Sequence, residues 1–203
     1  MNEFIEIPAT KKSLGMRKLI HGLGVNDSIY LTENIIDGKR FACPFYVKWK
    51  SMLERCYSEK YQMKMPTYKG CYVCDEWLIF SNFKAWMSKQ DWHGKQLDKD
   101  ILVQGNKIYS PSTCIFVTQN INTLTSDNKA KRGKFPVGVN FDKQKGKYEA
   151  RFSVNGRSVR VGNFLNPSDA FEAYKIEKYK HISSIAIMQS EPLRSALLNY
   201  KIK

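Results

Sequence analysis

Apolar side chains recur at helical spacing in two stretches of the first half of the chain. Residues 44–59 and 75–87 each place an apolar stripe on one face of a helix, with polar side chains on the other faces. Pro44 suits the first turn of the first helix, where its missing N–H needs no partner. The two stripes consist of Phe45, Trp49, Met52, Leu53 and Cys56, and of Trp77, Phe80, Phe83 and Met87. We expect both stripes to form core.

The pattern changes from helical to alternating in the last third of the chain. Residues 147–154 alternate apolar and polar side chains, and so does the segment 157–164. Asn155 and Gly156 between them are typical of a type I′ hairpin turn. With a third segment over 137–142, this pattern predicts a three-stranded antiparallel meander.

A helix should follow the meander. Asn166 fits the N-cap, Pro167 the first helical position and Asp169 the first turn, where a carboxylate complements the free N–H groups. Ala170, Ala173 and Tyr174, at spacing i, i+3 and i+4, would pack on the apolar face of the sheet.

The other face of the predicted sheet is polar. It presents Asn140, Asp142, Arg151, Ser153, Ser158 and Arg160, and it is flanked by Lys143, Lys145 and Lys147. A narrow sheet of this kind can enter the major groove of DNA, where Arg reads guanine edges and Asn reads adenine. An ordinary solvated face of a small domain is the other interpretation of the same pattern.

The centre of the chain carries a shorter pattern. It predicts a strand over 97–103, a turn at Gly105 and Asn106, a second strand over 114–117 and a helix from Thr118. The fold class predicted for the whole chain is therefore α+β: a ββα unit with flanking helices, followed by a small three-stranded antiparallel sheet packed on one helix.

The charge narrows the range of partners. The chain has 203 residues, 42% of them hydrophobic, and a formal net charge of +14, so we expect a globular protein that attracts polyanions. Charge alone does not separate nucleic acid from anionic lipid. The sequence contains no apolar run of about 18 residues and no signal-peptide pattern, so we expect a cytoplasmic protein without a membrane partner.

The five cysteines do not make a clear metal site. Their number is odd and no export signal is present, so we expect thiols and not a disulfide framework. Cys71 and Cys74 form one C-x-x-C motif, but a zinc site would need a second pair or nearby histidines. His21, His93 and His181 are scattered. The pattern favours buried cysteines over bound zinc.

Residues 137–182 resemble the Apetala/ERF integrase-like DNA-binding domain, through the string Val-Gly-Val, Gly-Lys-Tyr-Glu-Ala-Arg-Phe, Val-Gly-Asn-Phe and Asp-Ala-Phe-Glu-Ala-Tyr. The resemblance implies that the sheet docks in the major groove. It assigns contact roles to Arg151, Ser153, Arg160, Asn140 and Asp142. The plant domains usually carry arginines on the first strand and a tryptophan on the third, so the target sequence does not transfer.

Residues 41–126 resemble the HNH-type, or His-Me finger, endonucleases of bacteriophages. The resemblance rests on Trp-Lys-Ser-Met-Leu-Glu-Arg-Cys-Tyr, Cys-Asp-Glu-Trp and the central ββα pattern, in that order. It implies Mg²⁺-dependent hydrolysis of phosphodiester bonds, with Asp98 and Asn120 as metal ligands. Asn122 is the less favoured alternative to Asn120. The family's general-base histidine is replaced by Lys99.

Lys99 leaves the catalytic question open. It can be a desolvated base, because only a strongly lowered pKa would let a lysine accept a proton near pH 7. His93 or Asp100 can instead act as base. The third interpretation is a degenerate finger retained for DNA binding, with Lys99 on a phosphate.

The sequence thus predicts five segments: an N-terminal extension (1–40), an HNH-like domain (41–126), a basic linker (127–136), an Apetala/ERF-like domain (137–182) and a tail (183–203). The leading hypothesis is a double-stranded DNA-binding protein like the phage homing endonucleases. The alternative is a non-catalytic regulator or inhibitor that uses the same modules to bind DNA or a protein partner. The target sequence and the oligomeric state are left open.

Overall fold

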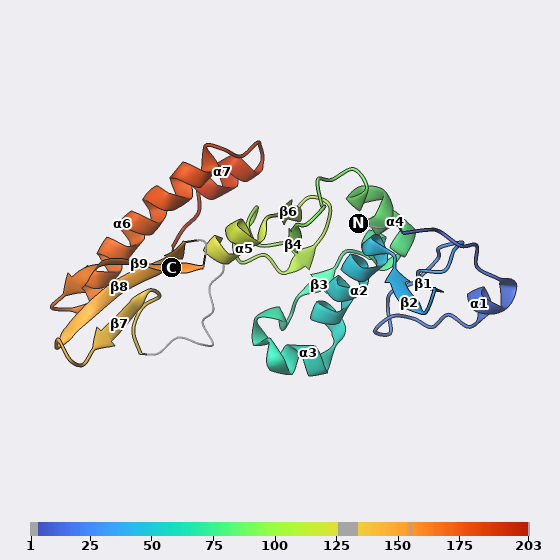
Figure 1. Ribbon diagram of the computed structural model, residues 1–203, viewed down its shortest axis with the longest axis horizontal. Coiled ribbons are helices and arrows are strands. Elements are labelled where there is room, and N and C mark those ends of the chain that lie inside the picture. Colours follow the sequence, from blue (N-terminus) through green and yellow to red (C-terminus); the bar gives the residue numbers. More distant parts are fainter. Residues whose placement is uncertain (1–3, 126–133, 155, 203) are drawn as a thin grey trace. The chain divides into compact units, whose positions relative to one another are not determined.

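The computed structural model describes residues 4–125, 134–154 and 156–202 (Figure 1). The chain is a mixed α+β protein that divides into two compact units. The first unit combines Met1–His93 with Gly105–Phe116, and the second combines Gly94–Gln104 with Val117–Lys203. The segment 41–126 therefore contributes to both units. The predicted linker falls largely on residues 126–133, which lie outside the described residues.

The first unit holds ten of the short elements. They are α1 (Lys11–Gly15), β1 (Glu33–Ile36), β2 (Lys39–Ala42), α2 (Pro44–Tyr57), α3 (Glu59–Lys64), η1 (Pro66–Tyr68), β3 (Tyr72–Val73), η2 (Asp75–Leu78), α4 (Phe80–Met87) and β5 (Ile108–Tyr109). β1 and β2 form an antiparallel hairpin, and β3 pairs with β5 in parallel. The N-terminal 40 residues, which showed only weak patterns, therefore contain a short helix and most of a hairpin.

The core of this unit lies between α2 and α4. Both predicted stripes are in it: Trp49, Met52, Leu53 and Cys56 of the first and all four members of the second are buried. The Trp49 indole donates a hydrogen bond of 2.7 Å to the carbonyl of Trp77. Tyr46 is also buried and meets Phe80 edge-on. The core prediction is therefore confirmed except for Phe45, which is half-buried, and Tyr46 is an addition.

The single helix predicted over 75–87 is wrong, because the chain breaks it at Ile79. A 3₁₀ turn, η2, ends at Leu78, and α4 begins at Phe80. The intervening backbone is extended because it bridges to Val25: the Val25 N–H donates to the Leu78 carbonyl and the Phe80 N–H donates to the Val25 carbonyl. A contact distant in sequence thus overrides the local helical pattern.

The second unit contains β4 (Gln96–Asp98), α5 (Gln119–Thr125), β7 (Val139–Asp142), β8 (Lys147–Val154), β9 (Arg157–Phe164), α6 (Pro167–Ala186) and α7 (Leu193–Leu198). The division between the units passes through β6 (Ile115–Val117), which forms a small sheet with β4. The strand predicted over 97–103 is wrong beyond Asp98. The carboxylate of Asp98 accepts the N–H groups of Asp100 and Ile101 and turns the chain there.

The three-stranded antiparallel sheet has the predicted order β7-β8-β9 and packs on α6. Its core contains Val139, Ala150, Ala170 and Tyr174. Gly138 has a φ of +76°, and a Cβ there would lie 2.2 Å from the Tyr174 ring, so the close approach requires glycine. Asn166 caps α6 as expected by accepting the N–H of Asp169 at 2.8 Å.

The segment after α7 joins distant parts of the second unit. Gln104 and Lys201 exchange two hydrogen bonds, of 3.0 and 2.9 Å, through the Gln104 amide and the Lys201 backbone. The Tyr200 hydroxyl donates to the Thr125 carbonyl at 2.6 Å, and Ile202 packs against the core of the sheet. Residues 183–203, expected as a tail, thus continue α6, form α7 and return to the sheet. Among the described residues, none of the helices could cross a bilayer.

Candidate functional site

The face of the sheet opposite α6 carries the predicted DNA-contacting side chains. Side chains alternate along the strands, so the register that buries Val139 and Ala150 turns Asn140 and Arg151 outward. Across β8 and β9, Arg151 lies opposite Arg160 and Ser153 lies opposite Ser158. All of these outward residues are exposed. The structure therefore brings Asn140, Arg151, Ser153, Ser158 and Arg160 together on one face, which we call the polar sheet face.

Glu149 occupies the middle of the polar sheet face. Its side chain is 16% exposed and lies 3.2 Å from Arg151 Nη2 and 3.2 Å from Arg160 Nε. Two arginines directly opposite each other would repel, and the carboxylate between them compensates this repulsion. Our site prediction omitted Glu149, although the alternating pattern of β8 already placed it on this face.

A β-bulge shapes the same part of the sheet. The register shifts between Ala150 and Arg151, so that Arg160 faces Arg151 while Gly162 faces Ala150. Asn163 lies opposite Glu149, and its Oδ1 is buried without a hydrogen-bond partner. No sequence pattern indicates the bulge, and Asn163 was therefore also missed.

The β7–β8 turn forms the basic end of the polar sheet face. Asp142 Oδ1 accepts the N–H groups of Gln144 and Lys145, and Asp142 Oδ2 lies 2.9 Å from Lys145 Nζ. These hydrogen bonds, led by that of the Lys145 side chain, lower the pKa of Asp142. Lys143 and Lys147 are exposed beside it. Asp142, expected as a contact residue, is thus engaged in holding the turn.

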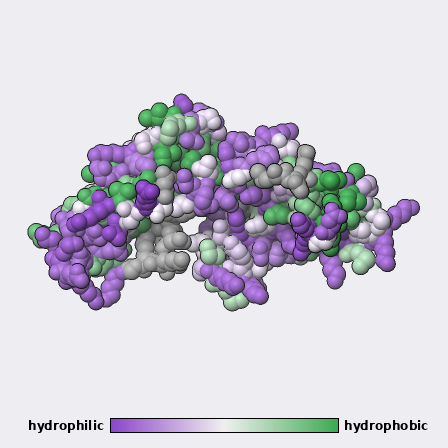
Figure 2. All heavy atoms as spheres, viewed as in Figure 1, coloured by the Kyte–Doolittle hydropathy of each residue, from purple (hydrophilic) through white to green (hydrophobic). Residues whose placement is uncertain are grey.

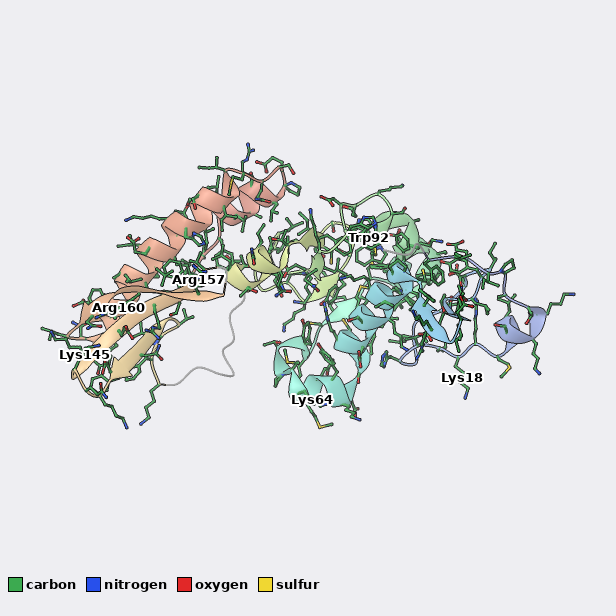
Figure 3. All side chains as sticks on the ribbon, in the orientation of Figure 1. Lys18, Lys64, Trp92, Lys145, Arg157 and Arg160 are labelled. Atoms are coloured by element: carbon green, nitrogen blue, oxygen red, sulfur yellow. The ribbon has the colours of Figure 1, made fainter. Side chains whose placement is uncertain are left out.

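Cations are spread along this part of the second unit. Lys145 lies beside the turn, and Arg157 and Arg160 lie along β9 (Figure 3). Hydrophilic side chains gather over the same end of the sheet (Figure 2). Exposed lysine and arginine beside serine and asparagine can contact phosphate groups and base edges, respectively.

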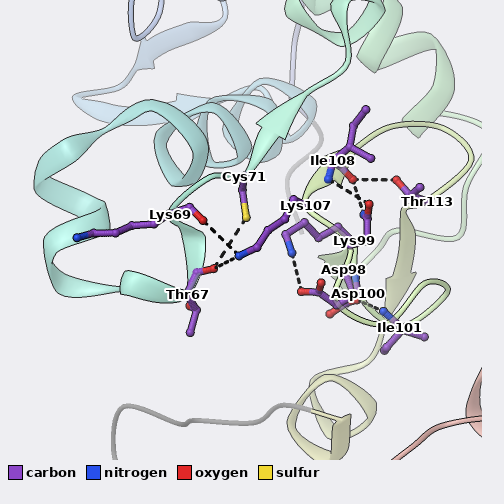
Figure 4. A network of polar contacts seen from close by, with 11 residues as sticks. Thr67, Lys69, Cys71, Asp98, Lys99, Asp100, Ile101, Lys107, Ile108 and Thr113 are labelled. Carbon is purple, nitrogen blue, oxygen red and sulfur yellow. Dashed lines mark hydrogen bonds and ion pairs between the residues drawn. The ribbon is translucent and has the colours of Figure 1, made fainter.

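The candidate catalytic residues lie at the end of β4 (Figure 4). Asp98 Oδ1 is 2.7 Å from both the Asp100 and Ile101 backbone nitrogens. Burial raises the pKa of the Asp98 carboxyl, and the two N–H groups partly offset this effect. The Lys99 side chain is only 5% exposed, and its Nζ lies 2.7 Å from Asp100 Oδ2. Lys99 is therefore a buried cation that pairs with a carboxylate.

The other predicted site residues lie on separate elements. α5 packs beside β4 and buries Ile121 and Leu124, whereas Asn120 is exposed and Asn122 is half-buried. His93 belongs to the first unit, where it stacks on Trp92 with ring centroids 3.8 Å apart.

The thiols and acidic groups form no metal cluster in the part of the chain that the structure describes. None of the five cysteines forms a disulfide, and four of them are buried. For a hard cation such as Mg²⁺, the residues of the second unit offer the second carboxylate oxygen of Asp98 and the amide oxygen of Asn120, which are suitable donor types.

Comparison of the chain with protein-family models, curated proteins and solved structures gives no match. Its function therefore has to be inferred from the geometry of the described residues.

Proposed function

We propose that the second unit binds double-stranded DNA by inserting the polar sheet face into the major groove. The observation that carries this proposal is the in-register pair of Arg151 and Arg160 on the face opposite α6, held by Glu149. An arginine pair fixed in position by a carboxylate is suited to recognition, because less side-chain entropy is lost on binding.

The width of the sheet suits the groove. Neighbouring strands lie about 4.8 Å apart, so three strands are roughly 10 Å wide, compared with about 12 Å for the major groove of B-DNA. α6 and the core occupy the other side of the sheet, so the polar sheet face can approach DNA.

The side chains on this face divide by the contacts that they can make. Arg151 and Arg160 can each donate two hydrogen bonds to a guanine edge, and Asn140 can pair with an adenine. Ser153 and Ser158 can donate to either bases or phosphates. Lys143 and Lys147 at the exposed turn suit backbone phosphates.

The test is a fluorescence anisotropy titration with a pool of duplexes that share flanks around a randomised centre. We expect Arg160→Ala to weaken binding to the duplexes that the parent chain prefers within this pool by roughly tenfold, which is the effect of one lost base contact. The matched control is Lys180→Ala, which removes the same charge from an exposed position on α6. Equal weakening by both variants, or binding that salt does not affect, would contradict readout by the sheet.

A second candidate function is metal-dependent cleavage of DNA by an HNH-like ββα finger. The observation that favours it is the strand–strand–helix order of β4, β6 and α5, with Asp98 at the end of β4 and Asn120 on the helix beside that strand. Asp98 and Asn120 would hold a Mg²⁺ ion, which would stabilise the leaving oxygen of the scissile phosphate. The ion pair between the buried Lys99 and the exposed Asp100 counts against Lys99 as the base.

Nicking of supercoiled plasmid with Mg²⁺ or Mn²⁺ separates the two functions. An active enzyme should lose nicking in Asn120→Ala, with Thr123→Ala, at an exposed position on the same helix, as the control. Absence of nicking by a chain that still binds duplex would overturn the enzyme proposal. That result would instead support the regulator or inhibitor, whose protein partner could then be sought.

A further inference from the structure

Arg55 is a half-buried cation for which the described residues supply no counter-ion. It lies on α2 in the first unit, and its Nε is buried without a hydrogen-bond partner. The guanidinium carbon lies 5.7 Å from the centre of the Tyr68 ring, and the Tyr109 hydroxyl is its hydrogen-bonding neighbour. Within the described residues, no carboxylate forms an ion pair with Arg55; Glu54 and Glu59 on the adjoining helical turns are exposed.

Two other cations lie near this group. Lys48 lies two helical turns before Arg55 on α2, and its pKa is lowered by burial and then by the charge of Arg55. Lys107 donates to the carbonyls of Thr67 and Lys69, on either side of Tyr68. Figure 4 shows this bridge from Lys107 to the loop. Cations therefore lie near Tyr68 both on α2 and at the residue that precedes β5.

Buried charges in proteins are normally paired, because an uncompensated charge is costly to remove from water. Here the side chains supply rings, hydroxyl groups and further cations, but no anion for Arg55. We propose that Arg55 binds a phosphate group, with Lys48 and Lys107 as the surrounding positive charges. Arg suits this role because its planar fork matches the oxygens of a phosphate.

The phosphate can come from the backbone of a duplex or from a free phosphate compound. The duplex is the expected source, and in that respect the inference builds on the proposed function. The site lies within the first unit and uses no residue of the sheet, so it can be tested without DNA.

The first experiment uses the full chain and inorganic phosphate. We expect phosphate at roughly millimolar concentration, where its general stabilising effect as an excluded salt is small, to raise the melting temperature more than chloride at equal ionic strength, and Arg55→Met to abolish this difference. Lys50→Met is the matched control, because Lys50 is exposed on the same helix. Loss of the phosphate response only in Arg55→Met supports the site.

Stability of the variant without ligand distinguishes a binding role from a structural one. Arg55→Met keeps the length of the side chain and removes the uncompensated charge, so the unliganded variant should melt at or above the temperature of the parent chain. A much lower melting temperature, with no phosphate response in the parent, would overturn the inference and make Arg55 a packing residue.

The second experiment identifies the source of the phosphate. With a duplex, Arg55→Met should weaken binding about fivefold at 0.15 M salt and reduce the slope of log K against log salt by about 0.9, as expected for one lost phosphate contact. An unchanged slope with a lost phosphate response points to a free phosphate compound. If the parent chain binds no duplex but responds to phosphate, the proposed function fails and this site stands. Absence of both responses overturns the site.

Discussion

Two charged clusters of the second unit each combine cations with carboxylates, but for different purposes. On the polar sheet face, Arg151 and Arg160 are 45% and 49% exposed and share one carboxylate. At the end of β4, Lys99 is 5% exposed and pairs with Asp100, while Asp98 binds two backbone N–H groups. The exposed cluster can exchange its internal ion pairs for a ligand at little cost. In the second cluster, which we call the buried cluster after Lys99, the Asp100 carboxylate is exposed, but Lys99 cannot leave it for a ligand without opening the fold. Burial, more than residue type, therefore separates recognition from structure here.

The largest expected effect is on the buried cluster. Asp98→Ala leaves two backbone N–H groups without their acceptor, so we expect a loss of about 2 kcal/mol in the free energy of unfolding. Asp98→Asn keeps an acceptor oxygen and should lose much less. Urea denaturation measures both. Equal losses in the two variants would show that the hydrogen bonds do not hold this turn.

The next effect concerns the polar sheet face. Glu149→Gln removes the negative charge between the two arginines, so we expect affinity for random-sequence duplexes to rise about fivefold at low salt, as for one added cationic contact. Discrimination between duplexes should fall, because the arginines are no longer held in place. Anisotropy titrations with selected and random duplexes measure both. A loss of affinity for both classes would assign Glu149 a direct contact with DNA.

A smaller effect is the pH dependence of the buried cluster. Burial raises the pKa of Asp98 in the folded chain above its ordinary value of 3.8. The folded state therefore binds the Asp98 proton more tightly than the unfolded state does. This difference stabilises the folded chain fully below the pKa of the unfolded state, and the stabilisation is lost as the pH rises through the pKa of the folded state. The stability of the parent chain relative to Asp98→Asn should thus decrease as the pH rises from about 3 to 7. If urea denaturation gave the same difference in stability between the parent chain and Asp98→Asn at every pH in this range, the burial of Asp98 would be contradicted.

The smallest effect is on folding of the sheet. Arg160→Ala should change the free energy of unfolding by less than about 0.5 kcal/mol, because half-exposed ion pairs contribute little. Chemical denaturation of the same preparation that is used for DNA binding tests this expectation. A loss as large as that of Asp98→Ala would remove the contrast between the clusters.

The sequence was most informative where local chemistry and periodicity agree. Alternation in β8 and the Asn166 cap led directly to the sheet and the start of α6, and the apolar stripes identified the core of the first unit. These features depend on side chains close in sequence or on simple burial.

Features that depend on distant contacts were not predictable. The backbone bridge from Val25 breaks the helix expected over 75–87, and the Asp98 turn ends the strand expected to reach residue 103. Burial of Lys99 contradicts the usual exposure of lysine, which only the folded chain reveals. Glu149 was overlooked because its charge has the same sign as the proposed partner, although its ion pairs organise the cations.

The hydrogen bonds between Gln104 and Lys201 have a consequence for synthesis of the protein. They join residues 97 positions apart, and Ile202 completes the apolar cluster beneath the sheet. Contacts of such long sequence separation form late, because much chain must first be ordered. During translation, β4 and α5 therefore leave the ribosome long before residues 200–202, whose contacts join them to the rest of their unit. A nascent chain halted before residue 200 would contain this unit without the contacts of Tyr200, Lys201 and Ile202 that complete it.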